Sequence, residues 1–413
     1  MAFKRLVCLS VGVLLALSCA EEPPIEASRE LLPDTGGRVT VAVISVNSAR
    51  RAALRNASLV TNIVAGLPPS TNFFILANDP SAFSVAGTSW PERIQLVELP
   101  FSNPITIWTQ DPFLVLKGGA GGSDTTLLNS KEFERAGDRL MAEKIAEIAG
   151  YELEQSSLYF EGGNIVSDDE FILIGANTIR HNAMKLELSE IEVVLEFQEE
   201  LGRRVLVIGP VPQPVAHIDM ILTPLGNRRV LLADASAGIR IAEHALETDP
   251  DSITGFEKYC EEHFFGHPAI REIHAKDGGT TSAPQVQGKT RKAIELSRLV
   301  APTLDGIATA LERYGYQVDR VPFLFGGPRS KDNEDEQAPL KADYPMLTYN
   351  NVLIEDDIEG KIVYLPRYGW PAMDDAASEI WEELGFSPRP IEGLTISAMY
   401  GGALRCSVKV VGR

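Results

Sequence analysis

The most constraining feature of this sequence is the alternation of short apolar runs with longer amphipathic segments. Val39 to Ile44 is a β-branched run typical of a buried strand, and Arg139 to Ala149 has the apolar spacing of a helix. The alternation continues to the last run, Leu404 to Val411, which predicts a closing strand. This pattern predicts an α/β fold. No repeat is visible in the sequence, which leaves structural repeats open.

The composition allows a large hydrophobic core, and the net charge disfavours some classes of binding partner. The chain has 413 residues, of which 44% are hydrophobic, and its net charge is −19. This length fits one large domain or two ordinary ones. The negative balance argues against binding to nucleic acid or to an anionic membrane surface. It suits a cationic ligand, although solubility alone is the simpler explanation.

The first residues have the pattern of an export signal. Two basic residues precede an apolar stretch from Leu6 to Leu17, which is too short to span a bilayer as a stable helix. Residues 1–18 are therefore predicted to be a signal peptide. The residues around Cys19 resemble a bacterial lipoprotein cleavage site, where the cysteine is acylated. Ordinary cleavage or retention is the alternative, because leucine is usual where Ala16 stands.

The rest of the chain divides into a tether and one domain. Residues 19–37 are rich in Pro, Glu, Asp and Gly without periodicity, which predicts a linker. Residues 38–413 are predicted to form a single catalytic domain. The protein would then be exported, either as a lipoprotein of the bacterial cell envelope or as a secreted protein. It would meet a membrane only through the lipid on Cys19.

Cys406 is the candidate nucleophile. It lies shortly after Gly401 and Gly402, which let the backbone turn tightly and approach a ligand closely. The simpler interpretation is a small buried hydrophobe, which is what most free cysteines are. A disulfide with Cys260 is a third option in an exported protein. We expect both thiols to be free.

Three further segments place ionisable side chains beside apolar runs. His217 and Asp219 lie two positions apart in a predicted strand, so both would point to the same face. Asp111 lies in an apolar and aromatic stretch, where an unpaired carboxylate is costly to bury. Glu161 precedes two glycines that permit close approach of the backbone to a ligand. The structural alternatives are a His–Asp pair, a turn cap and a hairpin turn, respectively.

Together with Cys406, these residues suit a guanidinium group. Carboxylates bind a planar guanidinium through paired hydrogen bonds, and a cysteine beside a histidine can act as a nucleophile. Their spread along the chain fits a pocket at the centre of a radially built domain. A serine hydrolase is disfavoured, because no Gly-x-Ser-x-Gly motif occurs.

These residues resemble the motifs of the guanidine-modifying enzymes of the pentein superfamily. That superfamily includes arginine deiminases, agmatine deiminases, amidinotransferases and protein-arginine deiminases. The matching segments, in the family's order, are Trp108-Thr109-Gln110-Asp111, Glu161-Gly162-Gly163-Asn164, His217-Ile218-Asp219 and Cys406 after its glycines. The resemblance implies a five-fold pseudosymmetric β/α propeller with a central active site.

Within the superfamily, the sequence most resembles the catalytic domain of protein-arginine deiminases. Free-arginine deiminases usually have arginine where Gln110 stands. Two departures from the subfamily are Arg405, where histidine usually precedes the cysteine, and Pro112, where many members have glutamate. No clustered calcium loop is visible. We therefore expect no required cofactor, and calcium dependence is left open without a clear site.

The resemblance also implies a role for each residue. Asp111 and Asp219 would hold the guanidinium, and Cys406 would attack its central carbon as a thiolate. His217 would protonate the leaving ammonia and then activate water. No metal ligand is assigned. The residues implied to contact the substrate are Glu161, Trp108, Asn164 and Arg405.

The predicted function is hydrolysis of arginine side chains in peptides or proteins to citrulline and ammonia, through a thiouronium intermediate on the cysteine. The alternative is a small-molecule guanidine enzyme, either an arginine or agmatine deiminase or an amidinotransferase. In an enzyme for free arginine, Arg405 would bind the α-carboxylate of the substrate. A third alternative is a non-catalytic propeller used for binding, which would tolerate loss of Cys406 or His217.

Overall fold

The architecture comes from a computed structural model. The predicted signal peptide and Cys19 lie outside the residues that the structure describes. Within those residues, every helix falls short of the combination of length and hydropathy that crossing a membrane requires. The described residues are 29–46, 59–79, 92–118, 124–263, 286–327 and 342–413.

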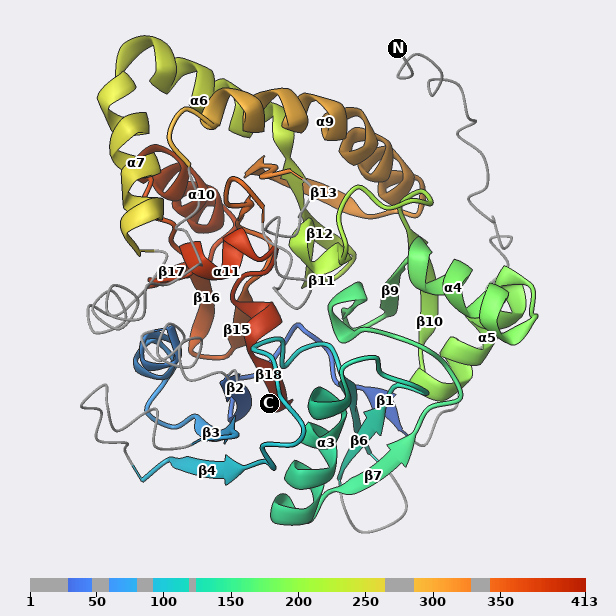
Figure 1. Ribbon diagram of the computed structural model, residues 1–413. Helices are drawn as coiled ribbons and strands as arrows, with labels where there is room; N and C mark the ends of the chain where they lie inside the picture. Colours follow the sequence, from blue (N-terminus) through green and yellow to red (C-terminus); the bar gives the residue numbers. More distant parts are fainter. Residues whose placement is uncertain (1–28, 47–58, 80–91, 119–123, 264–285, 328–341) are drawn as a thin grey trace.

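The described strands form five sheets, which follow one another around the molecule in Figure 1. The first sheet contains β1 (Glu30–Leu31), β5 (Phe113–Lys117), β6 (Thr125–Asn129) and β7 (Glu152–Gln155). The second contains β8 (Ile165–Ser167), β9 (Phe171–Gly175) and β10 (Arg204–Ile208). The third contains β11 (Leu222–Gly226), β12 (Arg229–Asp234), β13 (Gln317–Leu324) and β14 (Leu347–Thr348).

The fourth sheet contains β15 (Leu353–Asp357), β16 (Gly360–Pro366) and β17 (Ser387–Ile391). The fifth contains β18 (Lys409–Gly412), β2 (Val41–Val46), β3 (Asn72–Ala77) and β4 (Ile94–Glu98). The fifth sheet joins the two ends of the chain, because β18 pairs with β2 and aligns Val410 with Ala42. The predicted α/β class is confirmed.

One order of pairing recurs in all five sheets. A first strand pairs antiparallel with a second, and the second pairs parallel with a third. Parallel neighbours need a crossover connection, and helices fill this place in every sheet. The crossover helices are α3 (Ala136–Ala149), α4 (Ala176–Leu186), α5 (Glu190–Leu201), α6 (Ala235–Thr248), α7 (Pro250–His263), α9 (Thr290–Arg313), α10 (Pro371–Glu383) and the helical residues 59–66.

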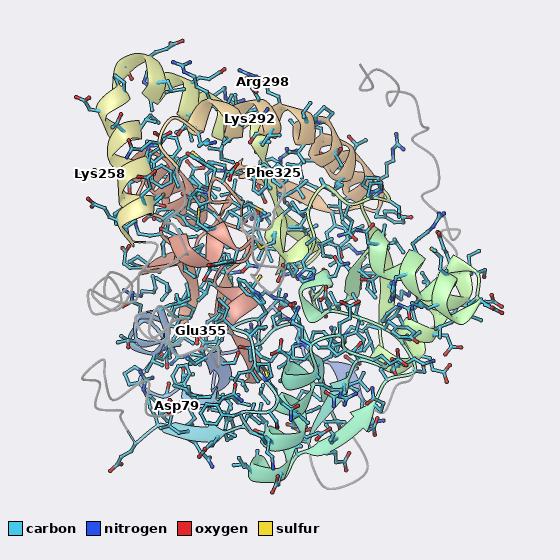
Figure 2. All side chains as sticks on the ribbon, in the orientation of Figure 1. Asp79, Lys258, Lys292, Arg298, Phe325 and Glu355 are labelled. Carbon is cyan, nitrogen blue, oxygen red and sulfur yellow. The ribbon has the colours of Figure 1, made fainter. Side chains whose placement is uncertain are left out.

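Local sequence signals account for several element boundaries. Helix α5 begins at a capping box, in which Ser189 and Glu192 each bond the backbone N–H of the other residue. It ends at Gly202, which has a positive φ of 75°. Strand β9 is buried at every position, as expected of a central strand that is covered on both faces. Charged side chains such as Lys258 on α7 and Lys292 on α9 lie on the outside (Figure 2).

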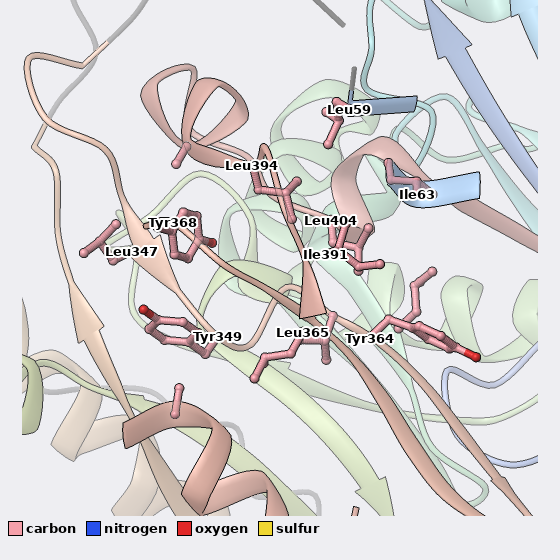
Figure 3. Packing of buried hydrophobic residues seen from close by; sticks show 14 of the residues in the cluster. Leu59, Ile63, Leu347, Tyr349, Tyr364, Leu365, Tyr368, Ile391, Leu394 and Leu404 are labelled. Carbon is pink, nitrogen blue, oxygen red and sulfur yellow. The ribbon is translucent and has the colours of Figure 1, made fainter. Parts of the chain in front are cut away.

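A large apolar cluster supports the C-terminal part of the chain. Figure 3 shows members of this cluster, including Tyr349, Tyr368, Leu394 and Leu404, all of which are buried. Burial of each such side chain contributes about 1.5–3 kcal/mol to stability. Leu404 directly precedes the 3₁₀ turn η3 (Arg405–Ser407), so this core fixes the turn that carries Cys406.

The packed domain begins before the predicted boundary at residue 38. Strand β1 pairs with β5, and Leu31 is buried. The Asp34 N–H donates to the carbonyl of Ser167 in β8, the Ser167 N–H donates to Asp34 Oδ2, and Gly37 bridges to Asp356 of β15. The end of the predicted tether is therefore corrected. Residues 30–37 are polar in composition, but pairing with distant strands orders them.

Candidate active site

Each predicted motif lies in the turn that leads into the first strand of a sheet. Asp111 precedes β5, and the 3₁₀ turns η1 (Gly162–Asn164) and η2 (Ile218–Met220) precede β8 and β11. Turn η3 precedes β18, and Asn351 has the equivalent place before β15. Because the five sheets share one topology, their entry turns lie together, and the contacts described below join them.

His217 and Asp219 lie in a turn rather than in the predicted strand. His217 is extended, Ile218 begins the turn η2, and β11 starts only at Leu222. Both side chains still enter one site, because Asn164 accepts a hydrogen bond from the Ile218 N–H at 3.1 Å and holds the turn in place. We predicted that the two side chains point to one face because they lie in a strand. They do enter one site, but from a turn.

The His217 imidazole lies between two carboxylates. Its Nε2 is 2.7 Å from Glu161 Oε2, and its Nδ1 is 3.6 Å from Asp111 Oδ1. Burial alone would lower the pKa of His217, but the charges of Asp111 and Glu161, with the hydrogen bond to Glu161, raise that pKa to about 9. The imidazole is therefore protonated at neutral pH and can donate a proton.

Asp111 and Asp219 each present a buried oxygen without a hydrogen-bond partner. These atoms are Asp111 Oδ1 and Asp219 Oδ1, and both side chains are at least 95% buried. The second oxygens are bonded, Asp111 Oδ2 to Arg135 at 2.8 Å and Asp219 Oδ2 to Arg405 at 2.9 Å. Buried carboxylate oxygens are costly without a donor. The two free oxygens thus mark a place for a cationic hydrogen-bond donor.

Cys406 lies beside Asp219 in this site. Its Sγ is 4.0 Å from Asp219 Oδ2 and 3.7 Å from Met220 Sδ. Its backbone N–H donates to Asn351 Oδ1 at 3.0 Å, which fixes the turn. Burial, and then the negative charges of Asp219 and Asp111, raise the pKa of the Cys406 thiol well above its ordinary value. Without a bound cation, the group is therefore a neutral thiol at pH 7.

The two buried cysteines of the described residues are both free. Cys260 belongs to the large apolar cluster around α7 and α10, whereas Cys406 belongs to a different cluster. Burial raises the pKa of the Cys260 thiol as well. The expected free thiols therefore occupy separate parts of the fold, and Cys260 is a matched reference for tests of Cys406.

Trp108 and Asn164 serve as supports in this structure. The Trp108 ring fills the space above Gly402, where an added Cβ would overlap the indole. Asn164 uses its amide to bond Thr178 Oγ1 at 2.7 Å, Gln213 at 2.9 Å and the Ile218 N–H. Both residues position the turns that carry the ionisable groups. Their predicted contact with the substrate stays a prediction.

Arg405 lies in a different place from the one that its predicted substrate-binding role requires. Its guanidinium is bonded to Asp34 through Nε and Nη2, to Asp219 through Nη1 and to the Ile165 carbonyl. Its side chain is 9% exposed. A guanidinium that is committed in this way holds Asp219 and does not offer a binding group to a substrate carboxylate. The predicted contact of Arg405 with a substrate stays a prediction.

Arg135, Asn351 and Asp34 are site residues that sequence reasoning missed. Arg135 bonds Asp111 at 2.8 Å and Asp138 at 2.6 Å, and its Nη1 is 3.5 Å from Glu161. The Arg135 guanidinium thereby contacts both Asp111 and Glu161 and reduces the repulsion between these two carboxylates. No local pattern marks Arg135 or Asp34. The position of Asn351 before an apolar strand was a visible signal, because the other site turns share it.

One group of described residues has the spacing for a metal ion. Asp111, Glu161 and His217 each offer a ligand atom, and these atoms lie within 4.8 Å of one another. A metal needs a neutral imidazole, and the raised pKa of His217 keeps its ring protonated at neutral pH. A metal ion at this group would therefore have to displace the proton on His217.

Two solved structures of agmatine deiminases share this architecture. The C. jejuni enzyme is 13% identical, with a TM-score of 0.57 over 92% of this chain and 95% of that chain. The Enterococcus faecalis enzyme is 14% identical, with a TM-score of 0.58 over the same shares of the two chains. This chain has the pentein fold.

The pentein fold that the sequence resemblance implied is thereby confirmed. At such low identity, the likeness shows the fold alone. No protein-family model and no curated protein sequence matches the chain. The chemistry of this pentein-fold protein must therefore be argued from its own side chains.

Gly163 gives a direct test of the geometry around His217. A Cβ at this position would overlap His217 Nδ1 and would lie 3.1 Å from Asp111 Oδ1. We expect Gly163→Ala to displace the imidazole and to lower kcat by about 10²-fold, because small misplacements of reacting groups are costly. Gly306→Ala is the control, since nothing lies within 4 Å of a Cβ at that helical position. Equal kcat values for the two variants would count against this site.

Proposed function

We propose that this protein hydrolyses the guanidinium group of a small cationic molecule through a covalent bond to Cys406. The observation that carries the proposal is the pair of buried oxygens without a hydrogen-bond partner, Asp111 Oδ1 and Asp219 Oδ1, together with the Cys406 thiol, whose Sγ lies 4.0 Å from the other oxygen of Asp219. A guanidinium is planar, cationic and rich in N–H donors, so it can satisfy both oxygens at once. An acid, His217, lies against one of these carboxylates.

The reaction follows from the positions of the acid and the nucleophile. The Cys406 thiolate bonds to the central guanidinium carbon, the bond from that carbon to one amino group breaks, and His217 gives a proton to the departing ammonia. The now neutral His217 removes a proton from water, which attacks the same carbon. The C–S bond then breaks, the thiolate is restored, and an uncharged ureido product leaves.

The bound substrate supplies a positive charge that favours ionisation of the Cys406 thiol. In the free protein, burial and two carboxylates raise the pKa of Cys406. A guanidinium bound between Asp111 and Asp219 places a positive charge beside the sulfur and lowers that pKa. The ureido product has lost this charge, so it binds the carboxylates more weakly. Both activation of the thiol and release of product would then depend on the charge of the substrate.

The substrate class that we favour is a small guanidine without a carboxylate near its tail, such as agmatine. Arg405 is bonded to Asp34 and Asp219, so this arginine is not available for the α-carboxylate of free arginine. The two compared structures are of agmatine deiminases. These observations support the small-molecule alternative better than the predicted peptide or protein substrate, which becomes an outcome of the test below.

Two further proposals concern the architecture and the location of the protein. The recurring strand order supports a five-fold pseudosymmetric propeller with the active site at its centre. The basic and apolar start of the chain supports removal of residues 1–18, with acylation of Cys19 and export to the cell envelope. Export would bring the site into contact with guanidines outside the cytoplasm.

A panel of guanidines tests the proposed function. Agmatine, free arginine and an arginine amide with a blocked amino group are each incubated with the protein, with and without calcium. We expect ammonia and ureido product from agmatine, with a kcat/KM at least about tenfold above the other two, because a mismatched charged group costs more than about 1.4 kcal/mol. Turnover of the blocked amide alone would restore the peptide prediction. No turnover of any guanidine would refute the proposal.

A further inference from the structure

The side chain of Arg405 joins two carboxylates from distant parts of the chain. Its Nε and Nη2 bond Asp34 Oδ1 and Oδ2 at 2.9 and 3.2 Å, and its Nη1 bonds Asp219 Oδ2 at 2.9 Å. The arginine side chain is almost fully buried. It also directly precedes Cys406 in the turn η3, so this ion-pair chain runs from the N-terminal segment to the reacting groups.

Asp34 is itself held firmly by the backbone around it. Its Oδ2 accepts a hydrogen bond from the Ser167 N–H at 2.9 Å, and its own N–H donates to the Ser167 carbonyl at 2.9 Å. Arg413 Nη2 donates to the Asp34 carbonyl at 2.7 Å. These hydrogen bonds hold Asp34 in place against Ser167 of β8 and against Arg413.

The division of Arg405 between two partners has a consequence for Asp219. A guanidinium has a fork of donors that fits a single carboxylate with two parallel bonds. Asp34 takes that fork, so Asp219 receives only one bond and keeps Oδ1 free. Without Asp34, the fork would turn to Asp219 and occupy the oxygen that a substrate needs.

We propose that Asp34 is a positioning residue of the active site: by holding the fork of Arg405, it leaves Asp219 with a free oxygen for the substrate cation. This inference rests on the proposed function. It gives residues 30–37, the last part of the predicted tether, a role in the active site.

Substitution of Asp34 by asparagine tests this role. Asp34→Asn is expected to raise KM for the guanidine substrate about tenfold, because the substrate loses one charged hydrogen bond to Asp219. The value of kcat should change less than about threefold. Glu30→Gln is the matched control. It removes a carboxylate from the same segment, but its partner Arg203 bonds Ser167 and Leu31 and does not reach Asp219. Equal KM values for the two variants would overturn the proposal.

A second readout does not depend on turnover. Alkylation of Cys406 by iodoacetamide, followed by mass spectrometry across a pH series, gives the midpoint at which the thiol loses its proton. Asp219 and Asp111 are the charges that raise the pKa of this thiol, and three cationic side chains, His217, Arg405 and the buried Lys409, interact with one or both of those carboxylates. In Asp34→Asn, Arg405 is less neutralised and its positive charge favours the thiolate. The midpoint of Cys406 alkylation should therefore shift to lower pH in Asp34→Asn. In Asp34→Glu, which restores the carboxylate, the midpoint should be at the wild-type pH.

A purely structural role would lower the melting temperature of Asp34→Asn and leave both KM and the alkylation midpoint at their Glu30→Gln values. If Asp34→Asn does not fold, Arg405→Lys gives the same test, since lysine keeps the charge but cannot bridge two carboxylates. A KM and midpoint equal to those of the wild type would then overturn the inference. If the wild type turns over no guanidine, the proposed function fails, and the alkylation midpoint alone decides the role of Asp34.

Discussion

Replacement of Cys406 by serine is expected to abolish turnover, with a residual rate below about one thousandth of the wild-type rate. A hydroxyl ionises far less readily than a thiol, so serine is a much weaker nucleophile at neutral pH. His217 is protonated there and serves as an acid. Steady-state ammonia release, with a detection limit below one turnover per hour, is the measurement.

Cys260→Ala provides the matched control for this prediction. Cys260 is the other buried, free thiol among the described residues, and it lies in a different apolar cluster. Its substitution leaves a small cavity and should lower the melting temperature while kcat/KM stays within about twofold. Undiminished turnover in Cys406→Ser would remove the covalent mechanism. If the wild-type protein turns over no guanidine at all, the alternative of a non-catalytic binding propeller returns.

Substitution of Asp111 by asparagine has the second of the two largest expected effects. It removes one of the two carboxylates that hold the guanidinium and leaves the substrate cation partly unpaired in a buried site. Such losses cost about 2–5 kcal/mol, which corresponds to a rise in KM of roughly 30- to 4,000-fold. The pKa of His217 should also fall from about 9, because Asp111 is the group whose charge raises it most.

Asp168→Asn separates this effect from a general loss of buried charge. Asp168 is fully buried, accepts a hydrogen bond from the Tyr316 hydroxyl at 2.9 Å, and lies at the opposite end of β8 from the turn η1. This variant should be less stable than the wild type but should keep its KM. Guanidine kinetics and thermal unfolding of both variants form the comparison. An unchanged KM in Asp111→Asn would show that this carboxylate does not hold the substrate.

The fold class and the relation among the site residues could be predicted from the sequence because their signals are local. Alternating apolar runs and helices indicate α/β structure within short windows. Asp111, Glu161, His217, Asp219 and Cys406 each stand next to a turn and an apolar strand. In the structure His217 contacts Asp111 and Glu161, Cys406 contacts Asp219, and the charges of the two groups influence each other. The prediction that His217 lies in a strand was wrong. His217 instead precedes a turn, and this turn leads into the strand β11.

The interactions of Arg405 could not be predicted, because they join distant parts of the chain. Its partner Asp34 is 371 residues away in sequence and lies in a segment whose composition indicates a linker. A basic residue beside a nucleophile is equally consistent with substrate binding and with an internal ion pair. Only the three-dimensional arrangement distinguishes the two, and it also explains why the domain begins before residue 38.

The covalent intermediate is the most direct test of the account. The protein is mixed with agmatine, quenched in acid within milliseconds, and digested, and the peptide that carries Cys406 is weighed by mass spectrometry. We predict an added amidine with the substrate's tail on Cys406, at a mass one ammonia short of the intact guanidine, and no adduct on Cys260. Product formation with an unmodified Cys406 at every quench time would contradict the central claim.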